Sequence, residues 1–159
     1  MVKSALLKRG HLLLSLMMVG TATIIYSFKA APDDLQLISW SNRCLLHLFD
    51  PDGAGKLKKW DLNLTSDNFL RLKKYYQGGK QEYFSFHLRR FKDISYLGTT
   101  TYGTLRLLTN ADDVIVQTYN DPKGNIDSMT TCVDLPVRNA SPEELDSLRS
   151  ALLQLKAGR

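Results

Sequence analysis

The stretch FLRLKKYYQGGKQEYFSFHL, residues 69–88, contains two β-prone runs separated by a glycine turn. In the first run leucines alternate with charged residues, and in the second Phe84 and Phe86 share a face. The intervening QGGK is typical of a tight connection between antiparallel strands. The sequence therefore predicts a β-hairpin over residues 68–92.

Further strands are predicted on both sides of this hairpin. Residues 60–64 alternate before it, and β-prone segments follow at residues 100–109, 114–119 and 126–137. Turn-forming residues separate these segments, so that neighbouring strands are joined by short connections. We expect an antiparallel meander of five or six strands, curved enough to resemble a barrel.

One helix is predicted at each end of the meander, which makes the fold class α+β. Apolar residues recur at near-helical spacing over residues 33–49. Near the C-terminus, Ser141 and Pro142 precede two glutamates in the pattern of a capped helix start. The apolar stripe of this second helix comprises Leu145, Leu148, Leu152 and Leu155.

An apolar run, GHLLLSLMMVGTATIIYSF, occupies residues 10–28 and follows a basic tip at residues 1–9. As a helix it would span about 28 Å, which matches the hydrocarbon core of a bilayer. The positive-inside rule places the tip in the cytoplasm and a single domain, residues 33–159, in the periplasm. The alternative is a cleaved signal peptide, but the run continues past Ala22, which favours an uncleaved anchor in the bacterial inner membrane.

The net charge of +5 does not indicate nucleic-acid binding. Four of the 21 basic residues flank the apolar run, which leaves 17 basic against 16 acidic residues in the exported part. Residues 56–92 are nevertheless basic, with ten lysines or arginines against three acidic residues. This stretch is either a solvated face or a surface for an acidic partner or anionic headgroups.

Cys44 and Cys132 are the only cysteines. Because an oxidising compartment favours pairing of an even set, we expect a disulfide between them, with two free thiols as the alternative. Two cysteines without CxxC spacing do not make a metal site.

No catalytic or cofactor-binding motif is present, and we expect no enzymatic activity and no cofactor. Of the three histidines, only His47 and His87 belong to the exported part, and neither lies in a recognisable triad pattern. The loop at residues 50–61 matches an EF-hand at its aspartates and glycine, but its fifth position is alanine and its twelfth is Asp61 rather than glutamate. An ordinary helix-to-strand turn is therefore expected there.

Aromatic residues are concentrated between residues 75 and 102. They either pack in the core or line an apolar groove for a hydrophobic small ligand or a partner strand. The candidate ligand- or partner-binding residues are Tyr83, Phe84, Phe86, Tyr102, Val114 and Val116.

The layout resembles that of the accessory partners of membrane-bound transcriptional regulators, the ToxS and VtrC type and the PsaF/MyfF proteins that accompany fimbrial regulators. The resemblance covers the anchor at residues 1–28 and the β region at residues 56–137. It implies a non-enzymatic periplasmic protein that binds and stabilises the regulator's periplasmic domain as a heterodimer. In some members it also implies the sensing of an envelope signal such as pH or a bile-type ligand.

Two other classes stay open at this point. A periplasmic immunity protein that neutralises a secreted toxin would share the anchor, the size and the disulfide. An envelope hydrolase or redox protein would use Cys132 or His87.

Overall fold

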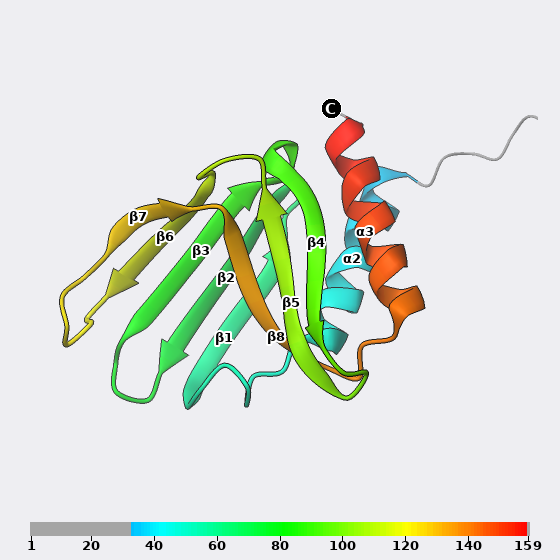
Figure 1. Ribbon diagram of the computed structural model, residues 1–159. Helices are drawn as coiled ribbons and strands as arrows, with labels where there is room; N and C mark the ends of the chain where they lie inside the picture. The colour runs from blue at the N-terminus through cyan, green and yellow to red at the C-terminus, as the bar shows by residue number, and fades with distance from the viewer. Residues whose placement is uncertain (1–32, 159) are drawn as a thin grey trace, which may run out of the picture. The chain divides into compact units, whose positions relative to one another are not determined.

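The computed structural model describes residues 33–158, in which one helix precedes and another follows eight strands along the chain; both helices lie on the same side of the sheets (Figure 1). The α+β class is confirmed, and the strands outnumber the five or six that were predicted. In chain order the elements are α2 (Asp34–Leu48), β1 (Leu57–Leu64), β2 (Phe69–Tyr76), β3 (Gln81–His87), the short 3₁₀ helix η1 (Leu88–Arg90), β4 (Phe91–Gly98), β5 (Tyr102–Thr109), β6 (Val114–Tyr119), β7 (Asp127–Thr130), β8 (Cys132–Arg138) and α3 (Pro142–Ala157).

The strands form two antiparallel sheets rather than one curved meander. The larger sheet has the order β1-β2-β3-β6-β7, and the smaller has the order β4-β5-β8. The barrel-like form of the predicted meander is also wrong, because the described strands do not form a closed barrel. The division into two sheets arises because the chain leaves the larger sheet after β3, returns to it at β6 and leaves it again after β7.

The predicted hairpin is β2 and β3, which pair over their whole length. Leu70 lies opposite Phe86 and Leu72 lies opposite Phe84, so the alternating apolar residues share one face. The turn contains Gly79 with a φ of 87°, a conformation that favours glycine. Local patterning was therefore sufficient to predict this hairpin, and the structure supplies its register.

Two features of the sheets differ from the sequence prediction. Residues 91–98, for which the sequence predicts no separate strand, form β4. Ile94 of this strand lies opposite Leu107 of β5. The predicted strand at residues 126–137 is instead two strands, β7 and β8, which belong to different sheets. The break falls at Thr131, whose carbonyl accepts from the backbone N–H of Thr109 at 2.8 Å.

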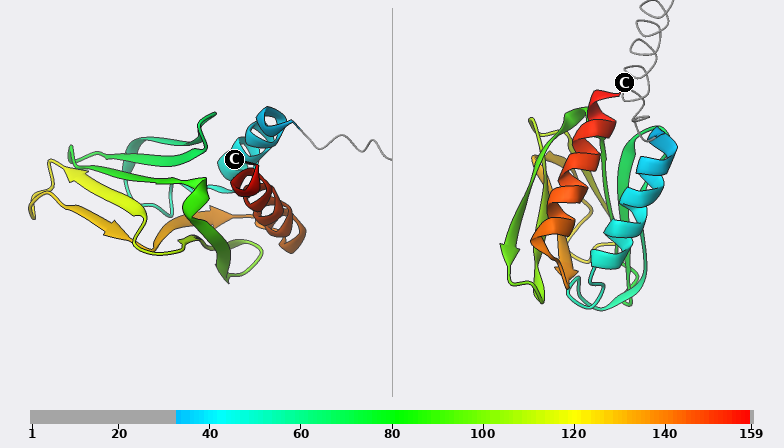
Figure 2. Two further views of the ribbon diagram at one scale, coloured as in Figure 1. Left: turned by 90° about the horizontal axis from the view of Figure 1, so that it is seen from above. Right: turned by 90° about the vertical axis from the view of Figure 1, so that its right-hand side faces the viewer.

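The two helices lie side by side and form a layer along one side of the sheets (Figure 2). α2 packs near β1, and α3 packs near β4. The Ser141 hydroxyl accepts from the backbone N–H of Glu144 at 3.1 Å, which confirms the predicted cap of α3. The apolar sides of helices and sheets share one core, whose largest fully buried side chains include Phe49, Phe86, Phe91, Leu45, Leu48, Leu70, Leu72, Leu105, Leu107, Leu135 and Leu148.

One end of the edge strand β1 is covered by a side chain of α2. Asn42 donates through Nδ2 to the carbonyl of Leu64 at 2.8 Å and accepts through Oδ1 from its backbone N–H at 2.7 Å. The amide thus satisfies both backbone groups of Leu64, as a neighbouring strand would. A new strand cannot pair with this end of β1 unless it displaces Asn42.

The predicted disulfide is wrong for this structure, because Cys44 and Cys132 are both free. Cys44 is buried on α2, where its Sγ donates to Oε1 of Glu144 on α3 at 3.7 Å. Cys132 instead begins β8, opposite Leu108. Packing of α2 against α3 directs the first thiol toward the other helix, whereas the second belongs to a sheet.

The described residues from 34 onward form one compact unit. Residues 33–158 include no helix with the length and apolar character that a bilayer crossing requires. The predicted anchor at residues 10–28 and the predicted tip at residues 1–9 lie outside the described part of the chain.

Candidate binding surface

The larger sheet turns one face to the core and the opposite, outer face to solvent. Alternation along β2 places Leu70 and Leu72 in the core and Lys73 and Tyr75 on the outer face. An open hollow of about 310 Å³ lies on this face. We call it the outer hollow; its residues are Arg71, Lys73, Lys74, Tyr75, Gln81, Glu82, Tyr83, Gln117 and Tyr119.

Two lysine ammonium groups on the outer face lie over tyrosine rings. The Lys73 ammonium lies 5.6 Å from the ring centre of Tyr83, and that of Lys59 lies 5.8 Å from the ring centre of Tyr75. Among the described residues, neither lysine forms an ion pair with a carboxylate, although Asp61 lies opposite Lys73 in the sheet register. Cation–π contacts orient the ammonium groups without neutralising them.

Arg71 is incompletely satisfied at the β1 side of the outer hollow. Its Nε is buried and has no hydrogen-bond partner, and the same holds for Oδ1 of Asn63, which lies opposite it on β1. Nη2 of Arg71 is 3.9 Å from Asp67, and the two side chains are 40% and 62% exposed, so that ion pair is weak. The guanidinium therefore retains donor capacity.

Beside the outer hollow lies the free edge of the larger sheet. β7 pairs with β6 alone among the described strands, and Asp127, Ser128 and Met129 are exposed. Figure 1 shows β7 on the side of the sheets away from the helices. Met129 is 56% exposed, and its cross-strand neighbour Ile115 is 39% exposed. Edge backbone and adjacent apolar side chains are thus both accessible to another chain.

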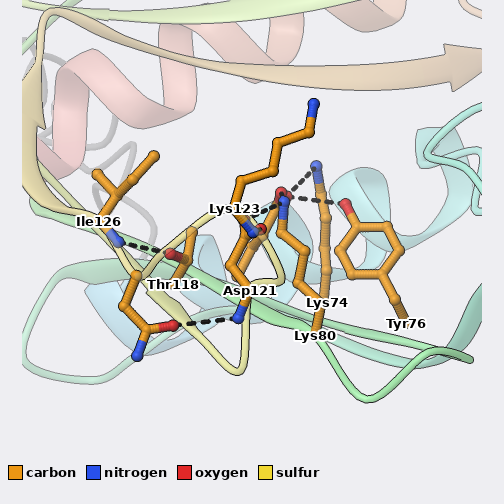
Figure 3. Close-up of polar contacts among 9 residues, drawn as sticks. Lys74, Tyr76, Lys80, Thr118, Asp121, Lys123 and Ile126 are labelled. Carbon is orange, nitrogen blue, oxygen red and sulfur yellow. Dashed lines mark hydrogen bonds and ion pairs between the residues drawn. The ribbon is translucent and has the colours of Figure 1, made fainter.

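A polar network on the core-facing side of the sheet positions the nearby turns (Figure 3). Lys80 lies 2.9 Å from both Glu82 and Asp121, and Tyr76 donates to Glu82 at 2.8 Å. These contacts tie the β2–β3 turn to the turn that follows β6. Burial alone would raise the pKa of Glu82, but hydrogen bonds from Lys80 and Tyr76 outweigh it and lower that pKa. The hydrogen bond from Lys80 likewise lowers the pKa of Asp121.

The connection between β6 and β7 is also held by its own hydrogen bonds (Figure 3). The backbone N–H of Ile126 donates to Oγ1 of Thr118 at 2.7 Å, and that of Lys123 donates to Oδ1 of Asp121 at 2.9 Å. The backbone N–H of Asp121 donates to Oδ1 of Asn125 at 3.1 Å. The turn that leads into the edge strand β7 therefore has a restrained backbone.

The candidate binding residues predicted from the sequence lie in different parts of the structure. Tyr83 lines the outer hollow, whereas Phe86 and Val114 are buried in the core. Phe84 lies opposite Val116, and both pack against the core from the inner face. Tyr102 begins β5 in the smaller sheet and is 64% exposed.

Other residues of the outer hollow were missed by the sequence reasoning. Lys73, Tyr75, Gln117 and Tyr119 line it with Tyr83. The available signal was the strand period, since the outward positions of β2, β3 and β6 all alternate with the predicted core residues. Which outward residues meet depends on pairing of β3 with β6, across an intervening excursion into the other sheet.

The residues considered for catalysis are also separated. His87 ends β3, where its Nδ1 accepts from the backbone N–H of Arg89 at 3.0 Å, while Cys132 is in the smaller sheet. In the loop after α2, Oδ1 of Asp50 accepts from the backbone N–H of Asp52 at 3.2 Å, as in an ordinary turn. Residues 33–158 contain no group of three or more potential metal ligands.

Comparisons of the chain with protein-family models, with curated proteins and with solved structures find no match. Its function is therefore inferred from the geometry and chemistry of this surface.

Proposed function

We propose that the protein is a non-enzymatic binding partner that pairs with another protein through the free edge of β7. The observation that carries this proposal is an accessible edge strand flanked by exposed apolar side chains on β6 and β7. An added strand would gain backbone hydrogen bonds from the edge and would cover Ile115 and Met129.

The other sheet edges are less available than β7. Asn42 occupies the end of β1, and the backbone N–H of Asp50 donates to the carbonyl of Pro136 on β8 at 2.8 Å. Beside β4, Nη2 of Arg149 on α3 donates to Asp93 at 3.2 Å. The β8 and β4 edges thus meet a loop or a helix of the same chain and β1 is blocked at its Leu64 end, so β7 is the best place for pairing.

The partner we propose is the periplasmic domain of a membrane-bound transcriptional regulator. This choice rests on the predicted anchor at residues 10–28 and on the resemblance described above. Anchoring of both proteins in the inner membrane would confine them to two dimensions and raise their effective concentration. A modest strand-pairing interface would then be sufficient to stabilise the regulator.

Photo-crosslinking at native expression tests this function. Benzoylphenylalanine replaces Met129 on β7 in one strain, and in the control strain it replaces Ser147, which is exposed on α3. We expect the β7 position alone to crosslink to a single-span protein with a cytoplasmic DNA-binding domain. Equal crosslinking from both positions, or none from β7, would contradict the proposal. A secreted toxin in the crosslinked band would instead identify an immunity protein.

A further inference from the structure

We propose that the outer hollow receives a carboxylate side chain from an acidic segment of the partner protein. This proposal rests on the function proposed above and assigns the chemistry of the contact beside β7.

The outer hollow carries positive charge. The outward side chains of the hollow include the cations Arg71 and Lys73 and no carboxylate. Glu82 contributes to the lining, but it belongs to the core-facing set of β3 and is engaged by Lys80 and Tyr76. Arg71 has only the long ion pair with Asp67, and Lys73 has no ion pair with a described carboxylate, so an incoming carboxylate would meet positive charge that is only partly neutralised. Complementary charge improves both orientation and association rate.

The cations of the outer hollow have unused hydrogen-bonding capacity. Nε of Arg71 is buried, so an incoming carboxylate would meet the Nη groups, and the ion pair of Nη2 with Asp67 at 3.9 Å is too long for a hydrogen bond. Lys73 contacts a tyrosine ring and no described carboxylate. A planar guanidinium next to an ammonium suits a carboxylate, because hydrogen bonds between charged groups are about twice as strong as neutral ones.

The walls of the hollow suit a peptide side chain. Tyr75, Tyr83 and Tyr119 provide aromatic surface around the cations. The Tyr119 hydroxyl donates to Oε1 of Gln117 at 3.1 Å, and Nε2 of that glutamine donates to Asp127 at 3.4 Å. These contacts restrain the wall formed by Gln117 and Tyr119. The ring of Tyr119 can still pack against the methylene groups of an acidic side chain.

The outer hollow adjoins the proposed edge strand through its β6 residues. Gln117 of β6 lies opposite Asp127 of β7 in the sheet register. A strand added to β7 would lie about 4.8 Å farther along the sheet. Because β3 and β6 separate β7 from β2, that strand would lie about 19 Å from Arg71 and Lys73, and the carboxylate would come from the segment that continues from it across the outer face of the sheet.

The test uses the full-length protein and two capped octapeptide probes, in which serine alternates with glutamate or with glutamine. Binding is followed by amide chemical shifts in zwitterionic micelles. We expect the glutamate peptide to shift resonances of β2, β3 and β6, and to bind more weakly at higher salt. Lys73→Gln should raise its Kd by about tenfold, as expected for one hydrogen bond to a charged group. Lys73→Arg should retain most of the affinity.

The control variant is Lys92→Gln, which removes an exposed lysine from β4 in the smaller sheet. Equal binding of the two peptides, an equal loss in Lys92→Gln, or no binding at millimolar peptide would overturn the proposal. Crosslinking from β7 remains a separate measurement. A hollow that does not prefer glutamate, in a protein that still crosslinks from β7, would refute this inference and leave the proposed function standing.

Discussion

Replacement of Asn42 with alanine tests whether α2 stabilises the edge of the larger sheet. The amide makes two hydrogen bonds, at 2.7 and 2.8 Å, to the backbone of Leu64. At about 1 kcal/mol net for each bond, their loss costs about 2 kcal/mol. Alanine is a better helix former than asparagine and returns about 0.6 kcal/mol within α2. We therefore expect Asn42→Ala to lower the free energy of unfolding by roughly 1.5 kcal/mol.

Urea unfolding of the full-length protein, followed by circular dichroism, measures this loss. Asn42→Asp keeps an acceptor for the N–H of Leu64 but has no donor for its carbonyl, so we expect an intermediate loss. Ser39→Ala is the control, because Ser39 is exposed on the same helix and its replacement changes only helix propensity. If Asn42→Ala is as stable as Ser39→Ala, then Asn42 does not stabilise the edge of β1.

Three further predictions concern other parts of the fold. Glu82 and Asp121 have lowered pKa values in the folded state. Their ionised forms therefore stabilise the fold above the pKa values of the unfolded chain, which are about 4. This stabilisation is lost as the pH falls through the lower pKa values of the folded state. Urea midpoints should accordingly fall in acid, and less so in Lys80→Gln. Burial raises the pKa of Cys44 to about 12, so alkylation of the native protein should modify Cys132 first; equal rates would contradict the packing of α2 on α3. Ser141→Ala should lower the free energy of unfolding by about 1 kcal/mol through loss of the α3 cap, and an unchanged urea midpoint would count against that cap.

The residues of the candidate surface show where sequence reasoning reached its limit. Tyr83 was singled out from its place in an aromatic-rich strand, and it lines the outer hollow. Phe84 and Val116 were singled out with it, but strand alternation turns both toward the core. Lys73 was noticed only as part of a basic stretch, because its place beside Tyr83 depends on strand pairing.

The sequence by itself determined those parts of the fold that depend on near neighbours. The alternation of β2 and β3 with a glycine turn between them specified the hairpin, and Ser141 with Pro142 specified the start of α3. Such signals lie within a few residues of the structure they produce, so period and turn chemistry are enough to read them.

Only the tertiary structure decided how these parts were combined. The division of residues 126–137 between two sheets, the covering of β1 by Asn42 and the separation of Cys44 from Cys132 all depend on contacts between distant segments. The same is true of the free edge at β7 and of the hollow beside it. Their energies come from packing and backbone pairing across the whole domain, which local periodicity does not encode.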